Sequence, residues 1–409
     1  MTYHDDPTKK TTVKPTRWLR SALSQNRNVA VLSGTTFFFV MAWFSWYPIL
    51  PLHLRNLGAT DAQVGLAFTL IQLGFQGMQL VGGVLADRFG RKKCIVWPTF
   101  AYLPLYLLAS MAHHWGWLLA ILVIVESLGA VQWPAYVAMI AESVPEERRG
   151  AAFAAFEFAT GLAIALGPAV GAVVLAVGDV PLLMGSTGLV ALVCAVARGL
   201  WLAEPVRHTS PPGLADWRAL LTGRLRWFLA VASLFYLLMS VTVHGPFISL
   251  HAKDVGRLSE QSINVLMAAV GLVATMAALA GGRLIRWLGA RRVLWLGTLT
   301  HAWALLVWAY VPVTLAGQGF LSLSWAGMQL SFIAYQTALA KQAGDESRGS
   351  VVGLVGTVTG LVAAAGPTLG AWLRGALGSS GPFWAASLLS LVVVLLLGRD
   401  DTASSASMG

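Results

Sequence analysis

The sequence predicts an all-α integral membrane protein with twelve transmembrane helices in two six-helix bundles. Composition is the first reason. Of the 409 residues, 56% are hydrophobic and 11% are charged, whereas a typical soluble domain has about 25% charged residues. A bilayer core is roughly 30 Å thick and needs about 20 apolar residues per helix. The chain is therefore long enough for about a dozen spans and for little else.

The basic residues predict the orientation of these spans. The formal net charge is +10, and of the 28 Lys and Arg residues only Arg55, Lys253, Arg257 and Arg374 fall on the predicted outer side. The others, Arg198 among them, are assigned to the inner face. Positive charge accumulates on the cytoplasmic side, so a multi-pass protein of the bacterial cytoplasmic (inner) membrane with both termini in the cytoplasm is expected. Because topology accounts for the charge, no nucleic-acid partner is expected.

An internal repeat predicts the two bundles. Arg149-Gly150 recurs as Arg348-Gly349, and Gly167-Pro168 recurs as Gly366-Pro367, each 199 residues later. The same spacing relates Gly83 to Gly282. Parallel repeats of this kind give two bundles related by a pseudo-two-fold axis along the membrane normal, with a path between them.

Five segments follow from the apolar runs. They are a cytoplasmic basic tail 1–27, an N-terminal bundle 28–203, a cytoplasmic connector 204–225, a C-terminal bundle 226–398 and a cytoplasmic tail 399–409. The last segment is short, small and polar, and is expected to be disordered.

One short connection between two predicted spans carries both charge signs. Gly83–Lys93 reads GVLADRFGRKK, and Gly282–Arg292 repeats it as GRLIRWLGARR. Asp87 stands at the cytoplasmic end of a helix, where the helix dipole disfavours an acid unless a positive charge compensates. Compensation by neighbouring basic residues would form a charge-linked latch between the bundles, and glycine allows close contact or a tight turn. The candidate latch residues are Gly83, Asp87, Arg88, Gly90, Arg91 and Lys92.

This motif and the repeat resemble the major facilitator superfamily of secondary transporters. The resemblance implies the superfamily fold and alternation between inward-open and outward-open states. The alternative interpretation of the loop is a solvated basic connection. Arg286 stands in the second copy where Asp87 stands in the first, so only the first half could form an acid-centred latch.

A second motif resembles the antiporter motif of the twelve-span drug/proton antiporter branch. It is carried by Gly161, Gly167, Pro168 and Gly171 in the predicted fifth span, with Ala172 where that branch has a final glycine. The resemblance implies export. Proline breaks the backbone ladder and glycine admits a neighbouring helix. Because Gly366-Pro367 and Gly370 repeat the pattern, inherited structural packing is the alternative.

Two acids lie within predicted spans, Glu126 in the fourth and Glu157 in the fifth. Ionisable groups within a membrane are costly and are functional candidates by default. A low-dielectric environment favours the uncharged form of a carboxylic acid, so such a group can bind a proton near neutral pH. Proton coupling is the hypothesis for both. The alternatives are cation recognition for Glu126, and an ion pair or wet vestibule for Glu157. The second half has Trp325 and Gly356 at the equivalent positions.

Aromatic and amide side chains are candidates to line a substrate cavity. Such groups suit amphipathic, often cationic ligands through stacking and cation–π contacts, although helix packing and interfacial anchoring are the alternatives. The candidates are Trp43, Tyr47, Gln72, Gln76, Trp133, Tyr136, His244, Gln329 and Tyr335.

The sequence lacks a phosphate-binding loop, an HExxH motif and a metal-spaced Cys/His cluster. We therefore expect no enzyme activity, no metal and no cofactor, with the proton gradient as the energy source and a monomer in the lipid bilayer. The predicted function is proton-coupled efflux of small amphipathic or cationic compounds. A symporter or uniporter for a specific metabolite, sugar, peptide or lipid is one alternative, and a non-transporting sensor or assembly protein is another.

Overall fold

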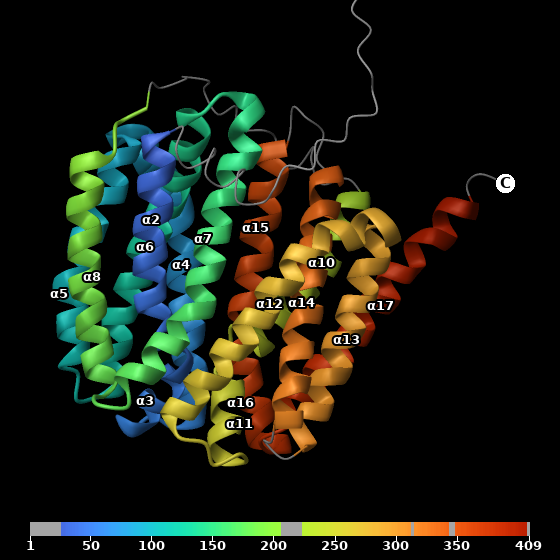
Figure 1. Cartoon of the computed structure of the whole chain (residues 1–409). Helices are drawn as coiled ribbons and strands as arrows, with labels where there is room; N and C mark the ends of the chain where they lie inside the picture. The colour runs from blue at the N-terminus through green and yellow to red at the C-terminus, as the bar shows by residue number, and fades with distance from the viewer. Residues whose placement is uncertain (1–25, 206–222, 312–314, 343–347, 407–409) are drawn as a thin grey trace, which may run out of the picture.

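The structure is a computed structural model that describes residues 26–205, 223–311, 315–342 and 348–406, and these residues form helices without a strand. Figure 1 shows the helices of the two halves standing side by side. The N-terminal half comprises α2 (Arg27–Phe44), η1 (Tyr47–Ile49), α3 (Leu50–Asn56), α4 (Asp61–Phe89), α5 (Arg91–Ser110), α6 (Trp115–Ser143), α7 (Glu146–Val174) and α8 (Val180–Trp201). The C-terminal half comprises α10 (Gly223–Thr242), α11 (Phe247–Asp254), α12 (Glu260–Leu288), α13 (Ala290–Tyr310), α14 (Leu315–Gln342), α15 (Arg348–Ala364), α16 (Gly366–Leu377) and α17 (Gly381–Ala406).

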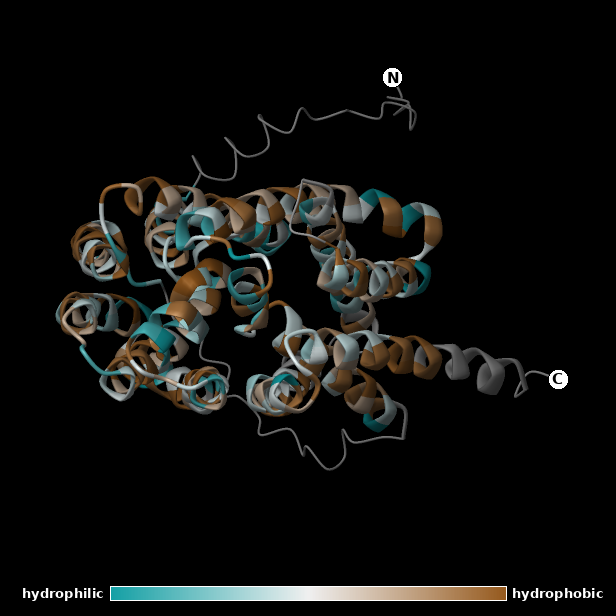
Figure 2. Ribbon diagram, turned by 90° about the horizontal axis from the view of Figure 1, so that it is seen from below, coloured by the Kyte–Doolittle hydropathy of each residue, from teal (hydrophilic) through white to brown (hydrophobic). Residues whose placement is uncertain are grey.

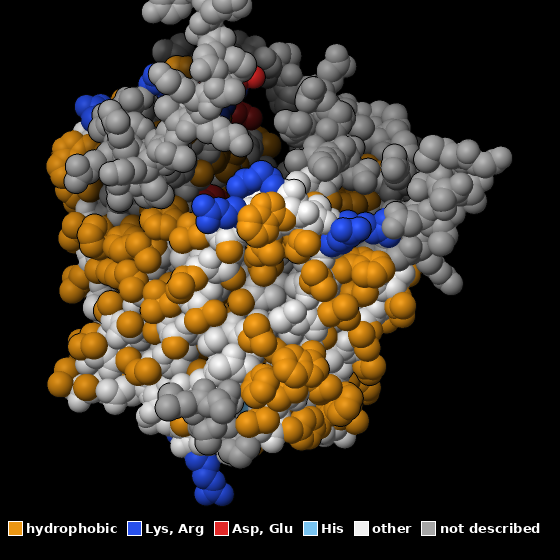
Figure 3. All heavy atoms as spheres, turned by 45° about the vertical axis from the view of Figure 1, so that its right-hand side comes forward, with side chains coloured by type: hydrophobic (Ala, Val, Ile, Leu, Met, Phe, Trp, Pro, Cys, Tyr) orange, Lys and Arg blue, Asp and Glu red, His pale blue; other side chains and the backbone are white. Residues whose placement is uncertain are grey.

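The prediction of an all-helical, multi-pass membrane protein is confirmed. Within the described residues, eight helices or continuous helix pairs are long and apolar enough to cross a membrane, and α4, bent by 42° near residue 80, raises the number to nine. The predicted total of twelve spans stays a prediction. Apolar side chains cover most of the face in Figure 3, and Lys and Arg gather mainly near its upper edge. In Figure 2 hydrophobic ribbon also predominates.

The repeat is visible in the backbone. Helices α4 and α12 each have 29 residues, and Gly90 and Gly289, 199 residues apart, follow them with φ of 99° and 83°. Equivalent hydrogen bonds recur at the same spacing. The Gln132 amide donates to the Ile95 carbonyl at 2.9 Å, and the Ser331 hydroxyl donates to the Leu294 carbonyl at 3.2 Å. The two halves therefore share both their helix order and their internal packing.

Two crossings join the halves. Helix α4 packs against α15 and α16, and α7 packs against α12. The first span of each half is broken, at Trp46–Ile49 between α2 and α3 and at Val243–Pro246 between α10 and α11. A large apolar core extends through both halves, and a second, smaller core lies in the N-terminal half around Phe156 and Met139.

The C-terminal end differs from the expectation. Helix α17 continues through Ala406, so the tail expected to be disordered is helical up to that residue. No glycine or proline occurs between residues 399 and 406 to stop the helix. Most of the predicted tail 1–27 and most of the predicted connector 204–225 lie outside the described residues, which begin at residue 26 and leave out 206–222.

Candidate functional site

Polar side chains connect the two halves where α4 crosses the C-terminal half. The Gln72 amide oxygen accepts a hydrogen bond from the Ser240 hydroxyl on α10 at 3.0 Å. One turn further along α4, the Gln76 amide fills the space that a Cβ atom would need at Gly360 on α15. The two amide candidates of α4, Gln72 and Gln76, therefore face the opposite half. Relative movement of the halves would change both contacts.

Glu126 lies near the middle of α6 and is only partly buried. Its carboxyl interacts electrostatically with the hydroxyls of Tyr47, Tyr102 and Tyr106. No described Lys, Arg or His forms an ion pair with it. A carboxylate in such surroundings is costly without a partner. The chemical options at this site are therefore protonation or contact with a cation.

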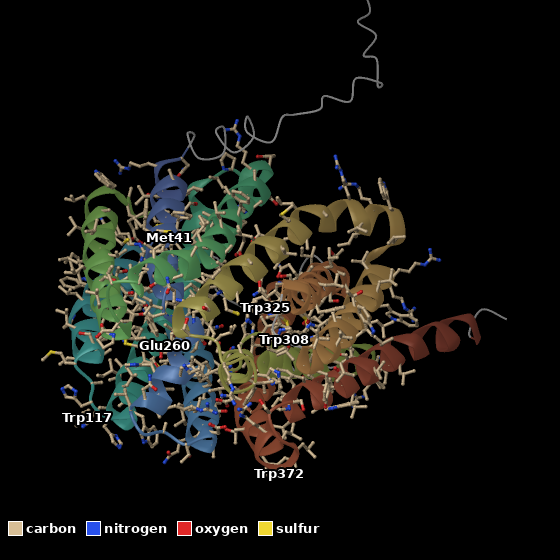
Figure 4. The ribbon with its side chains drawn as sticks, turned by 60° about the horizontal axis from the view of Figure 1, so that its bottom comes forward. Met41, Trp117, Glu260, Trp308, Trp325 and Trp372 are labelled. Atoms are coloured by element: carbon tan, nitrogen blue, oxygen red, sulfur yellow. The ribbon has the colours of Figure 1, made fainter. Side chains whose placement is uncertain are left out.

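The equivalent position in the C-terminal half is Trp325 on α14. In Figure 4 Trp325 lies on the side of that half nearest to the N-terminal half. Its indole N–H is buried and has no hydrogen-bond partner among the described residues. The same holds for the Trp43 indole N–H, the Gln72 amide nitrogen and the Tyr335 hydroxyl. Buried donors normally find an acceptor, so each of these four groups is free to donate a hydrogen bond to an acceptor outside the described residues.

The aromatic candidates pack against other aromatic rings of their own halves. Trp43 and Tyr47 have ring centroids 5.0 Å apart and are partly exposed. Tyr335 is buried and stacks on Phe235 at 5.5 Å. Trp133 on α6 is 38% exposed, and Gln329 on α14 is partly exposed.

Glu157 and His244 are exposed side chains in different parts of the molecule. We call the end of the helices that carries the Gly83–Lys92 connection the loop end. Counted from that end, Glu157 is 11 residues into α7 and Glu126 is 17 residues into α6, so Glu157 lies about 9 Å nearer to it. Glu157 has no ion pair with a described residue, and its exposure fits a wet vestibule. His244 lies in the gap between α10 and α11.

The candidate latch forms a charge cluster at the loop end. Arg91 Nη1 lies 2.7 Å from Asp87 Oδ1, and its Nη2 lies 2.9 Å from Glu142 Oε1 on α6. Gly90 has φ of 99°, which glycine adopts readily. The Glu204 carboxylate accepts hydrogen bonds from the backbone N–H groups of Arg91 and Lys92 at 2.7 and 2.9 Å. These partners lie in the N-terminal half and the start of the connector, so a latch that reaches the other bundle stays a prediction.

The glycines of the second motif give close helix contact. A Cβ atom at Gly167 would lie 2.7 Å from the Met41 carbonyl oxygen, and one at Gly171 would collide with the Ser45 carbonyl. In the repeat, Gly366 and Gly370 lie equally close to Ser240 and Phe247. Pro168 is buried in α7, whereas Gly161 has open space beside it. The contacts of both copies support the packing interpretation of this motif.

The family model of the Major Facilitator Superfamily matches residues 32–361 and 234–407, which together span nearly the whole chain. The chain belongs to the major facilitator superfamily. It is accordingly a membrane transporter rather than an enzyme, and transporters of this superfamily bind small-molecule substrates within a membrane.

Known relatives match this superfamily member to different extents. A Na(+), Li(+), K(+)/H(+) antiporter of Planococcus maritimus is 32% identical over 157 residues, which are 36% of this chain and 36% of the antiporter. The quinolone resistance protein NorA of Staphylococcus aureus is 21% identical over 316 residues, 76% of this chain and 78% of NorA. A solved bacterial homologue of the human lysosomal transporter Spinster gives a TM-score of 0.75 at 15% identity, covering 91% of this chain and 96% of that one. This last likeness shows the fold.

Sequence reasoning missed a second charge cluster in this transporter, at the end opposite the loop end. Arg55 forms ion pairs with Asp61 at 2.6 Å and with Asp254 at 2.9 Å. Arg374 pairs with Asp61 at 2.8 Å and also with Asp254. We call these four residues the four-charge cluster. Two pairs lie within a half and two cross between the halves. The sequence uses Arg55 and Arg374 only as signals of topology, and nothing in it indicates that the four residues meet.

Arg198 corrects one assignment. It was placed on the inner face, but its side chain is fully buried within the N-terminal half. Hydroxyl groups surround the guanidinium: Thr35 and Thr99 accept at 2.9 and 2.8 Å, and Tyr136 accepts at 2.8 Å. A charged group can lie inside a bundle when hydrogen bonds replace water. Tyr136, a cavity candidate, is thereby held in the packing of this half.

Proposed function

We propose that this transporter couples proton movement to the export of small amphipathic or cationic compounds. The observation that carries the proposal is Glu126, an acid near the middle of α6 that no described base neutralises. Protonation and cation binding satisfy the same carboxyl group, and they exclude each other. Competition of this kind is what exchange of a proton for a cationic substrate requires. The similarity to a quinolone resistance protein over 76% of the chain supports export of drug-like compounds.

The geometry suggests how the exchange would be coupled to movement. In the described state the four-charge cluster and the hydrogen bond between Asn56 and Glu260, at 3.1 Å, join the halves at the end of α3 and α11. We place this end outside the cell, following the distribution of positive charge. The described state is then closed to the outside. A substrate cation would reach Glu126 from the cytoplasm and displace its proton. Opening of the outer end would then release the substrate cation to the outside, and Glu126 would bind another proton.

A second candidate is the exchange of alkali-metal cations for protons. The Planococcus maritimus relative, with 32% identity over 157 residues, favours it. A carboxylate binds a small hard cation as readily as an organic one. The two candidates differ in what the aromatic residues would do. Trp43 and Tyr47 favour an organic cation through its apolar surface and contribute little to Na⁺ binding.

Proton release tests the proposal. Purified protein in weakly buffered detergent solution would receive tetraphenylphosphonium or NaCl, and the pH change would be measured for wild type, Glu126→Gln and Glu157→Gln. We expect the organic cation to release protons from wild type and Glu157→Gln, but not from Glu126→Gln. Release by Na⁺ alone would favour the second candidate. Binding of tetraphenylphosphonium without proton release would refute antiport and favour a uniporter or symporter. Folded protein that moves no solute in proteoliposomes would point to a sensor.

A further inference from the structure

A groove runs along the outer surface between α2 and α8, which lie side by side in Figure 1. Its volume is about 700 Å³. Val31, Gly34 and Phe38 line it from α2, and Val190, Val193 and Trp201 line it from α8. Phe38, Val193 and Trp201 are each more than half exposed. The groove therefore opens sideways, toward the surroundings of the helices and away from the other half.

The length of the groove matches one leaflet of a bilayer. On α8 the lining extends from Leu189 to Trp201, which is about 18 Å at the rise of an α-helix. Half of a hydrocarbon core is about 15 Å. The groove begins at the loop end, where α2 starts and α8 ends, and reaches the middle of the protein. The groove is open beside Gly34, where a Cβ atom would meet no other atom within 4 Å.

A positive charge stands at the mouth of this groove. Arg27 begins α2 and precedes Val31, Gly34 and Phe38 at helical spacing, so all four lie on one face. Arg27 is exposed, and its guanidinium has no partner among the described residues. Trp201 closes α8 at the same end, as expected for a residue at a membrane interface. Glu204, three residues after Trp201, does not neutralise this charge, because both of its carboxylate oxygens accept hydrogen bonds from backbone N–H groups of α5.

We propose that this groove binds one anionic phospholipid, with an acyl chain between α2 and α8 and the phosphate at Arg27. An acyl chain matches the apolar lining and its length. A phosphate matches the one unpaired cation at the mouth among the described residues. Thr35, on the inner wall, bonds the buried Arg198, so the occupied groove would support the polar network of the N-terminal half.

Lipid binding to the full-length protein in neutral detergent tests this proposal. Delipidated protein would be titrated with dioleoyl phosphatidylglycerol or dioleoyl phosphatidylcholine, and the first bound lipid would be measured by native mass spectrometry. We expect wild type to prefer phosphatidylglycerol. Gly34→Leu should weaken both lipids at least tenfold, the loss expected for two displaced methylene groups. Gly77→Leu, on α4 with equally open space, is the matched control and should bind like wild type.

The charge is tested separately. Arg27→Gln should weaken phosphatidylglycerol about fivefold and leave phosphatidylcholine unchanged, whereas Arg226→Gln, at the start of α10, should change neither. Glycerol 1-phosphate, the headgroup without chains, should not compete, and competition would indicate a phosphate site instead. A phosphatidylglycerol with a photoreactive acyl chain should label residues 30–38 and 189–201. Labelling elsewhere, or wild-type affinity in Gly34→Leu, would overturn the proposal.

Discussion

The four-charge cluster predicts how readily the end of α3 and α11 opens. In the described state Arg55 and Arg374 each contact both Asp61 and Asp254. Separation of the halves breaks the pairs Arg55–Asp254 and Arg374–Asp61. It leaves Arg55–Asp61 and Arg374–Asp254 intact, because each joins residues of one half. No charge of the cluster is then left without a partner, so the cluster contributes to the cost of opening only through its two crossing pairs.

The magnitude follows from the exposure of the groups. The side chains of Arg55, Asp61 and Asp254 are 23%, 36% and 35% exposed, and that of Arg374 is 7% exposed. We therefore assign each crossing pair about 1 kcal/mol, the upper end for exposed ion pairs. Asp254→Asn removes one crossing pair from the closed state. We expect it to raise the open-to-closed ratio about fivefold. Asp61→Asn together with Asp254→Asn removes both pairs and should raise the ratio about 25-fold.

A charge exchange provides the control. In Arg55→Asp with Asp254→Arg, both crossing pairs persist with one of them reversed, while the pairs within each half become repulsive in both states. The open-to-closed ratio should not exceed that of wild type, because every contact of the cluster across the halves is then attractive, although the protein becomes less stable. Spin labels at Asn56 and Glu260, which touch across the halves, would measure the ratio by distance distributions with Cys94 and Cys194 replaced. An exchange variant that opens as much as Asp254→Asn would contradict this account.

Two further predictions concern packing and capping. Gly171→Ala should lower the free energy of unfolding by about 1–3 kcal/mol, because the new Cβ atom would collide with the Ser45 carbonyl. Gly161→Ala in the same helix is the control and should leave the free energy of unfolding unchanged, since the space beside Gly161 is open. Melting temperatures of the two variants in detergent would test this. Glu204→Ala should lower the free energy of unfolding by about 0.5–2 kcal/mol, because the backbone N–H groups at the N-terminus of α5 lose their acceptor. We expect faster tryptic cleavage at Arg91 and Lys92, and an unchanged cleavage rate would contradict a capping role of Glu204.

The sequence predicts those parts of the structure that depend on periodic or repeated residue patterns, namely the helices and the equivalence of the two halves. The apolar runs predicted helices, and the 199-residue spacing predicted equivalent structure that recurs in Gly90 and Gly289. Contacts between residues that are distant in the sequence could not be predicted in this way. Nothing in the order of residues indicates that Arg374 lies against Asp61, 313 positions away. The burial of Arg198 could not be predicted either, because a basic residue three positions from a helix end is typical of a membrane interface, and its hydroxyl partners come from other helices.

Divergence between the repeats explains where function is concentrated. Identical copies would present the same side chains to one another across the pseudo-two-fold axis, and like charges placed so would repel. Pro48 and His53 recur 198 residues later as Pro246 and His251, and in this register Asp254 stands where the first half has Asn56. In the 199-residue register of the later helices, Arg374 stands where the first half has Leu175. Those two substitutions create every crossing pair of the four-charge cluster. Glu126 follows the same pattern, because the equivalent position holds Trp325 and not a second acid, and two neighbouring acids would disfavour simultaneous ionisation. Under the proposed function, a single acid then holds either the proton or the cation, while the repeated helices provide the common scaffold.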